Sequence, residues 1–162
     1  MMFKLVLLLA LIVGGCTSID DSQLLPTEAI AMTQNNSTAE VLEVQTKGEA
    51  NNYTFAVTVS SPDTGCDRYA DWWEVITPEG ELLYRRVLLH SHVDEQPFER
   101  SGSPVKIQPQ QQVIVRVHMS SDGYSPLARQ GTVESGFTAV TLSEGFAEDL
   151  KSVEPLPKNC AF

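Results

Sequence analysis

Apolar and polar residues alternate along most of the chain after about residue 39, and a period of two predicts β-strands. The clearest case is residues 53–59 (YTFAVTV), in which every second side chain is large and apolar. Residues 69–77 (YADWWEVIT) and 82–89 (LLYRRVLL) flank the sequence Pro-Glu-Gly, and this arrangement predicts a hairpin.

Two further strands are predicted at residues 113–119 and 132–142, the second interrupted by Gly136 as a bulge or bend would interrupt it. No segment keeps a helical apolar period for more than two turns. The sequence therefore predicts an all-β fold, an antiparallel β-sandwich of about seven strands over residues 39–162. The architecture is immunoglobulin-like, but the immunoglobulin Cys…Trp…Cys spacing is missing.

The start of the chain differs from the rest. Residues 5–13 form an unbroken apolar run behind Lys4, too short to cross about 30 Å of hydrocarbon but typical of a secretory signal. The run ends in Val-Gly-Gly-Cys, which resembles the lipobox of bacterial lipoproteins, in which the cysteine is acylated and becomes the new N-terminus. We therefore predict a signal peptide at residues 1–15 and lipid on Cys16; a buried N-terminal strand is the alternative.

Residues 16–38 show neither a sustained helical nor an alternating period, which predicts a tether between the anchor and the domain. A short amphipathic helix around residues 26–32 is the alternative. Thr17 follows the lipidated cysteine where an aspartate would favour inner-membrane retention. We therefore expect an outer-membrane location facing the periplasm.

The chain has three cysteines, so lipidation of Cys16 leaves Cys66 and Cys160. In an oxidising compartment this pair predicts one disulfide, with two free thiols as the alternative. The formal net charge of −10 repels phosphate backbones and anionic headgroups, which excludes nucleic acid as a partner and leaves the lipid to attach the protein to the membrane.

Residues 64–105 are the most distinctive part of the chain, with the blocks YADWWEV, YRR, HSHVDEQPF and RSGSPV. They resemble a motif of a family of small exported bacterial proteins with no assigned function. The resemblance implies a compact secreted β domain, and it supplies no activity, catalytic residue or ligand.

Histidines are the residues most capable of metal chemistry here. His90 and His92 are two positions apart and share a face of an extended strand, and His118 lies on the predicted strand 113–119. If the two strands are neighbours, three imidazoles could meet and bind zinc or copper, with Asp94 or Glu95 completing the shell.

The His-x-His patterns of cupins, copper–zinc dismutases and blue-copper proteins each fail at another required residue. Opposite charges are abundant nearby: Arg85, Arg86, Arg100, Asp94, Glu95 and Glu99. We therefore predict that His90 and His92 lie where the strand from Leu82 leaves the sheet, in a loop held by ion pairs. No metal or cofactor is expected, and the zinc or copper site is the alternative.

No recognised catalytic motif is present, such as Gly-x-Ser-x-Gly, a Walker loop, His-Glu-x-x-His or Cys-x-x-Cys. Trp72 and Trp73 point to opposite faces of one strand, so one indole can pack in the core while the other stays exposed. Trp72, Arg86 and Arg116 are therefore a candidate binding surface. The expected function is a lipid-anchored envelope module that acts by binding an envelope protein or a small ligand, not by catalysis.

We predict that Cys16 is the mature N-terminus and carries lipid. Mass spectrometry of the N-terminal peptide should find an acylated cysteine, and Cys16→Ser should release a folded protein from the membrane fraction. An unmodified peptide that starts at another residue contradicts the prediction.

Overall fold

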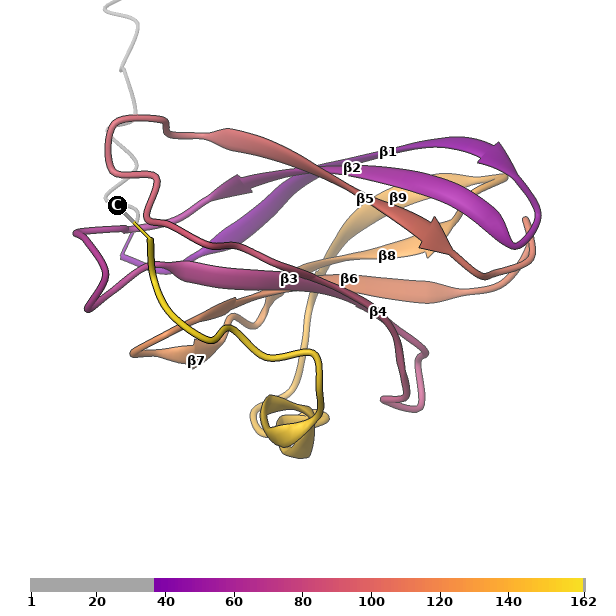
Figure 1. Ribbon diagram of the computed structural model, residues 1–162. Helices are drawn as coiled ribbons and strands as arrows, with labels where there is room; N and C mark the ends of the chain where they lie inside the picture. Colours follow the sequence, from indigo (N-terminus) through magenta and orange to yellow (C-terminus); the bar gives the residue numbers. More distant parts are fainter. Residues whose placement is uncertain (1–36, 162) are drawn as a thin grey trace, which may run out of the picture. The chain divides into compact units, whose positions relative to one another are not determined.

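Two antiparallel β-sheets face each other across an apolar core (Figure 1). The computed structural model describes residues 37–161; the predicted signal peptide, Cys16 and nearly all of the tether lie outside them. The strands are β1 (Glu40–Glu49), β2 (Asn52–Ser60), β3 (Ala70–Ile76), β4 (Leu82–Val87), β5 (Phe98–Val105), β6 (Val113–Met119), β7 (Gly123–Tyr124), β8 (Leu127–Thr132) and β9 (Gly136–Thr141). The predicted β-sandwich is confirmed.

The smaller sheet has the order β1-β2-β5, and the larger has β4-β3-β6-β8-β9, with β7 paired to β6. Residues 37–161 form nine strands, whereas the sequence predicted about seven. β5 and β8 were missed because their sequences, FERSGSPV and LARQGT, do not alternate. Gly136 is not a bulge inside one strand: with a φ of 80° it begins β9, after a turn that leaves β8.

The core lies between the sheets and is built from every second residue of the strands, as the alternation predicts. Phe55, Val57 and Val59 point inward from β2 and are fully buried. Trp73 and Val75 meet them from β3 on the opposite sheet.

The outer face of the larger sheet is also buried, because the C-terminal part of the chain covers it. Ile76 and Ile114 pack there against Leu150 of the 3-10 helix η1 (Glu148–Ser152). Among residues 37–161, no helix is long and apolar enough to cross a membrane.

A buried carboxylate lies under this cover. Glu74 on β3 is paired with Arg85 on one neighbouring strand and Arg116 on the other, with nitrogen–oxygen distances of 2.5 Å and 2.8 Å. All three side chains are at most 1% exposed. One negative charge thus balances two guanidinium groups away from water.

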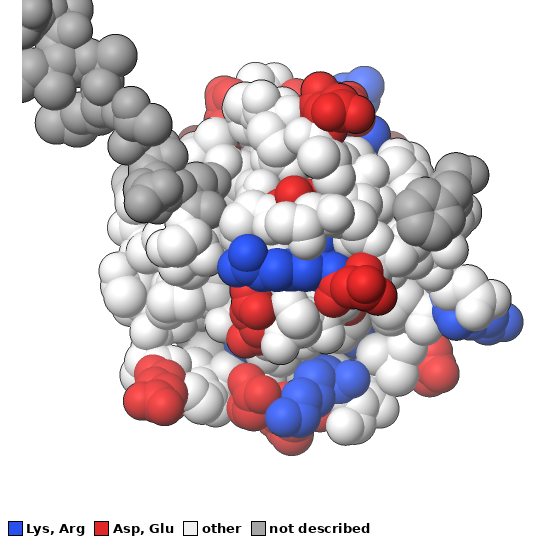
Figure 2. Space-filling model, turned by 90° about the vertical axis from the view of Figure 1, so that its left-hand side faces the viewer, with Lys and Arg blue, Asp and Glu red and all other residues white. Residues whose placement is uncertain are grey.

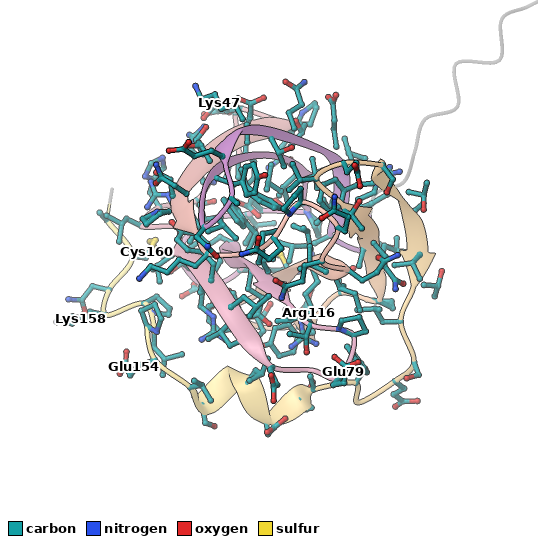
Figure 3. All side chains as sticks on the ribbon, turned by 90° about the vertical axis from the view of Figure 1, so that its right-hand side faces the viewer. Lys47, Glu79, Arg116, Glu154, Lys158 and Cys160 are labelled. Carbon is teal, nitrogen blue, oxygen red and sulfur yellow. A yellow bond between two sulfur atoms is a disulfide. The ribbon has the colours of Figure 1, made fainter. Side chains whose placement is uncertain are left out.

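The two arginines also hold the C-terminal segment. Arg85 donates hydrogen bonds to the carbonyl oxygens of Leu150, Val153 and Pro155. Arg116 donates to those of Phe146 and Ala147, at 2.6 Å and 2.9 Å. In Figure 3, Arg116 lies between the strands and the helical turn that these bonds anchor.

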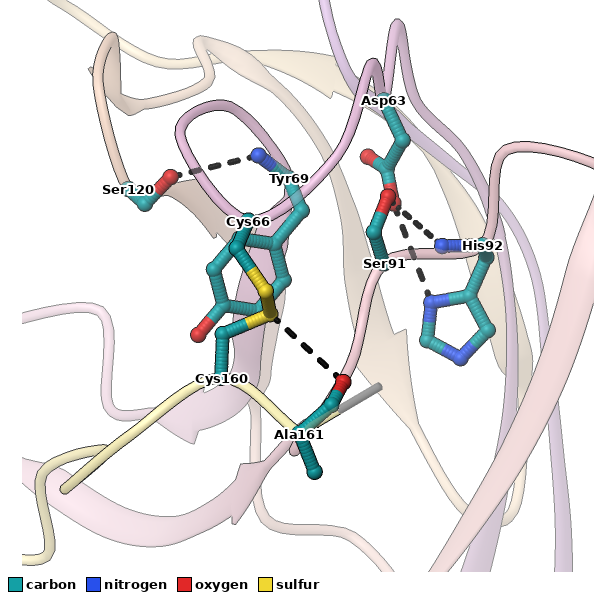
Figure 4. The surroundings of a disulfide bond; sticks show 8 residues. All are labelled: Asp63, Cys66, Tyr69, Ser91, His92, Ser120, Cys160 and Ala161. Atoms are coloured by element: carbon teal, nitrogen blue, oxygen red, sulfur yellow. Dashed lines mark hydrogen bonds and ion pairs between the residues drawn. A yellow bond between two sulfur atoms is a disulfide. The ribbon is translucent and has the colours of Figure 1, made fainter.

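The predicted disulfide between Cys66 and Cys160 is confirmed, with Cα atoms 5.6 Å apart (Figure 4). It closes a loop of 94 residues, and a loop of this length is worth about 4–5 kcal/mol in the chain-entropy model. The disulfide therefore fixes the end of the chain to the segment that precedes β3.

We predict that Glu74→Gln lowers the free energy of unfolding by about 3–5 kcal/mol, because it leaves two buried guanidinium groups without a counter-charge. Urea denaturation of the two proteins measures the difference. The matched control is Glu95→Gln, which breaks a solvent-exposed ion pair and should change the stability little. If both variants lost the same free energy of unfolding, the burial of Glu74 would not explain how much it stabilises the protein.

Candidate functional site

The loop of residues 88–97, between β4 and β5, lies at the end of the sandwich where the described chain begins. Ser37 accepts a hydrogen bond from Arg68, two residues after Cys66. Gly65 and Ala161, beside the two cysteines, share a hollow of about 380 Å³ with residues 90–95 of the loop. Figure 2 views this end and shows mainly uncharged atoms, with basic and acidic side chains near the centre, at the top and along the lower edge.

Asp63 holds the loop in place. One of its oxygens, Oδ2, accepts a hydrogen bond of 2.8 Å from the backbone N–H of His92. The other, Oδ1, accepts bonds from the hydroxyl of Ser61 and the backbone N–H of Ala70 (Asp63 and His92 are drawn in Figure 4). This role of Asp63 was not predicted from the sequence. The available signal was an aspartate shortly after a predicted strand, since such residues often hydrogen-bond nearby backbone groups.

His92 is buried and its imidazole has no hydrogen-bond partner. The ring stacks on Phe98 with 3.7 Å between centroids, and its Nδ1 is 3.8 Å from Oδ2 of Asp63, too far for a hydrogen bond. Burial lowers the pKa of His92, and the positive charge of Arg100 lowers it further. Both effects favour the neutral form of the ring.

The histidines named as possible metal ligands do not meet. The rings of His90 and His92 are 4.6 Å apart, but His118 lies on the outer face of the larger sheet. There its Nδ1 is 2.7 Å from Oδ1 of Asp71, and its ring stacks on Trp72. Within residues 37–161, no group of three or more His, Cys, Asp or Glu side chains is placed to hold a metal ion.

An irregularity in β3 explains the pair on the outer face. The register between β3 and β6 shifts between Ala70 and Trp72, and Asp71 lies in this shift and reaches His118. Burial raises the pKa of Asp71, and the hydrogen bond with His118 opposes this effect. Because Trp72 and Tyr124 pack on the His118 ring, the pair belongs to the buried outer layer.

The predicted ion pair in the loop is present for one arginine. Arg100 binds Glu95 through two hydrogen bonds, of 2.7 Å and 3.2 Å. The prediction named Arg85, Arg86 or Arg100 and is confirmed through Arg100. Arg85 instead binds Glu74, and Arg86 donates to the carbonyl oxygens of Ser101 and Val87.

The candidate binding surface is wrong for two of its three residues. Trp72 and Arg116 are 3% and 1% exposed, so both lie inside the protein; both tryptophans are buried, because the C-terminal segment adds a second layer. The large apolar side chains that the described residues do expose include Leu89 and Val93, at 57% and 50%. Both belong to the loop, and the backbone N–H of Ala161 donates to the carbonyl oxygen of Leu89.

The chain is similar to a protein named "Putative lipoprotein" from Halomicrobium mukohataei, with 43% identity over 84 residues. The match covers 52% of this chain and 41% of that protein's length. No family model and no solved structure matches the chain. The similarity to a lipoprotein agrees with the signal in residues 1–16 and points to a membrane-anchored protein of the cell envelope.

We predict that His92 makes the protein less stable as the pH falls below about 6.5. The folded state lowers the pKa of His92, so the unfolded chain takes up a proton first and the free energy of unfolding falls, by at most about 1.4 kcal/mol per pH unit. Urea denaturation between pH 7.5 and 5 measures this slope.

In this pH range, His92→Phe should have a flatter profile than the unmodified protein, because the substitution keeps a ring against Phe98 and removes the titrating group. His90→Gln is the control: that side chain is exposed and is a lesser cause of the lowered pKa of His92, so the slope should stay closer to that of the unmodified protein than the slope of His92→Phe does. If His92→Phe keeps the slope, another titrating group causes the loss of stability at lower pH.

Proposed function

We propose that the protein is a lipid-anchored module of the cell envelope that acts by binding a partner protein or a small ligand, not by catalysis. The observation that carries the proposal is the loop of residues 88–97, which presents exposed apolar side chains from a rigidly held backbone.

The apolar pair in the loop has the features of a contact surface. Leu89 is more than half exposed and Val93 is half exposed, although their neighbours Leu88 and His92 are buried. Asp63 fixes the backbone of the loop, and the end of the chain next to Cys160 fixes it from the other side. A surface that is already ordered loses little conformational entropy when a partner binds.

Buried polar groups, in contrast, mostly bind one another. Glu74 is shared by two arginines, Asp71 binds His118, and Asp63 accepts several hydrogen bonds. A catalytic acid or base must reach a substrate atom, and these carboxylates are already used to hold the structure. This supports binding over catalysis.

The position of the loop suits an anchored protein. The loop is at the end of the sandwich where the described chain begins, and we propose that it meets its partner close to the membrane that carries the anchor. We propose that this membrane is the outer membrane and that the domain lies in the periplasm.

We predict that a photo-crosslinking amino acid at position 89 or 93 gives discrete adducts in intact cells, because these side chains form the contact. The same amino acid at position 153 is the matched control, since Val153 is 41% exposed but lies outside the loop. Adducts should be identified by mass spectrometry and should disappear when the second loop position is changed to serine.

The same adducts from position 153, or none from positions 89 and 93, contradict the proposed contact. Elemental analysis of protein purified without a His-tag tests the metal alternative. Stoichiometric zinc or copper that is lost in the double variant His90→Ala and His92→Ala would replace the binding proposal with a metal site.

A further inference from the structure

A small hollow lies at the loop end of the seam between β4 and β5. These strands are edges of different sheets, and Arg86 bridges them by donating a hydrogen bond of 3.1 Å from Nε to the carbonyl oxygen of Ser101. Beside this bridge is a hollow of about 80 Å³, lined by residues 86–90, His92 and Arg100. The volume is sufficient for one small polyatomic group.

The polar lining of this seam hollow is basic. Four of the lining residues carry basic side chains, Arg86, Arg100, His90 and His92, and the other three, Val87, Leu88 and Leu89, are apolar. No acidic side chain lines it. This is unusual in a chain with a formal net charge of −10.

Both arginines have donors to spare. Arg86 uses Nε and Nη1 for carbonyl oxygens, and Arg100 uses Nη1 and Nη2 for Glu95 and for the carbonyl of Glu99. Within the described residues, Nη2 of Arg86 and Nε of Arg100 make no hydrogen bond. Each arginine can therefore donate a further charge-assisted hydrogen bond to a carboxylate or phosphate oxygen.

His92 independently indicates a missing ligand. Its side chain is 1% exposed, it lines the hollow, and neither ring nitrogen has a partner. A neutral imidazole always carries one N–H donor, and a buried donor without an acceptor is costly. Burial is the main cause that lowers the pKa of His92; the charges of Arg100 and His90 lower it further, and those of Asp63 and Glu95 oppose them.

We propose that the seam hollow binds one oxyanion group, a carboxylate or a phosphate, held by Arg86, Arg100 and the N–H of His92. The assignment rests on the proposed binding function and names the chemistry of the ligand. Leu89 lies at the hollow with 57% of its surface exposed, so it can contact an apolar part of the same ligand. The metal hypothesis fits this hollow less well, because two guanidinium groups repel a cation.

Nuclear magnetic resonance of the full chain tests the proposal, with sodium acetate and sodium phosphate as separate probes at pH 7.5 and constant ionic strength. Side-chain signals of His92, Arg86 and Arg100 should shift and saturate with at least one probe. Saturation by acetate alone identifies a carboxylate site, saturation by phosphate alone identifies a phosphate site, and saturation by both supports the shared chemistry. Sodium chloride should give no saturable shift.

Arg86→Gln and Arg100→Gln should each weaken the binding at least tenfold, as expected for the loss of a charge-assisted hydrogen bond. Lys106→Gln is the matched control: it removes one exposed positive charge elsewhere on the surface and should leave the affinity unchanged. Backbone amide signals of β3 and β6 report whether each variant is folded.

Shifts that do not saturate, that chloride reproduces, or that folded Arg86→Gln and Arg100→Gln variants retain would overturn the proposal. The titration of the unmodified chain decides the question even if a variant does not fold. A negative result leaves crosslinking from positions 89 and 93 unaffected, so failure of the oxyanion site and failure of the proposed contact can be told apart.

Discussion

The carboxylate of Glu74, shared by Arg85 and Arg116, is the interaction on which the outer layer depends. Burying three charged groups costs several kcal/mol for each ion, and the mutual attraction repays the cost only if their remaining hydrogen bonds are made. The spare N–H groups of the arginines bind backbone carbonyls of residues 146–155. The charges therefore hold the C-terminal segment, and the segment keeps water away from the charges.

This arrangement connects the middle of the larger sheet to the candidate site. The segment held by Arg85 continues to Cys160, which is bonded to Cys66. The next residue, Ala161, donates to the carbonyl oxygen of Leu89 and so restrains the loop between β4 and β5. The loop between β4 and β5, at one end of the sandwich, is thus supported through the C-terminal segment by the buried charges of Glu74, Arg85 and Arg116.

The sequence could predict the sandwich and the disulfide, because alternation and cysteine number are local or countable properties. It could not predict the outer layer, because Glu74 and Arg116 meet only when β3 pairs with β6. The sequence also contained no sign that Arg85 is the second partner of Glu74, because the two residues become neighbours only when β3 pairs with β4.

Packing in the seam explains why its hollow lies next to the loop. Gly102 has no side chain, and a Cβ there would lie 2.6 Å from the ring of Tyr84. Tyr84 therefore fills the middle of the seam, against Gly102 and Trp73. Arg86, the next residue of β4 on this face, is too polar to be buried in the same way, and an inward-pointing charge on an edge strand also discourages pairing with other chains. The residue that protects the edge thus also lines the hollow, and edge protection alone does not account for the unpartnered imidazole of His92 beside it.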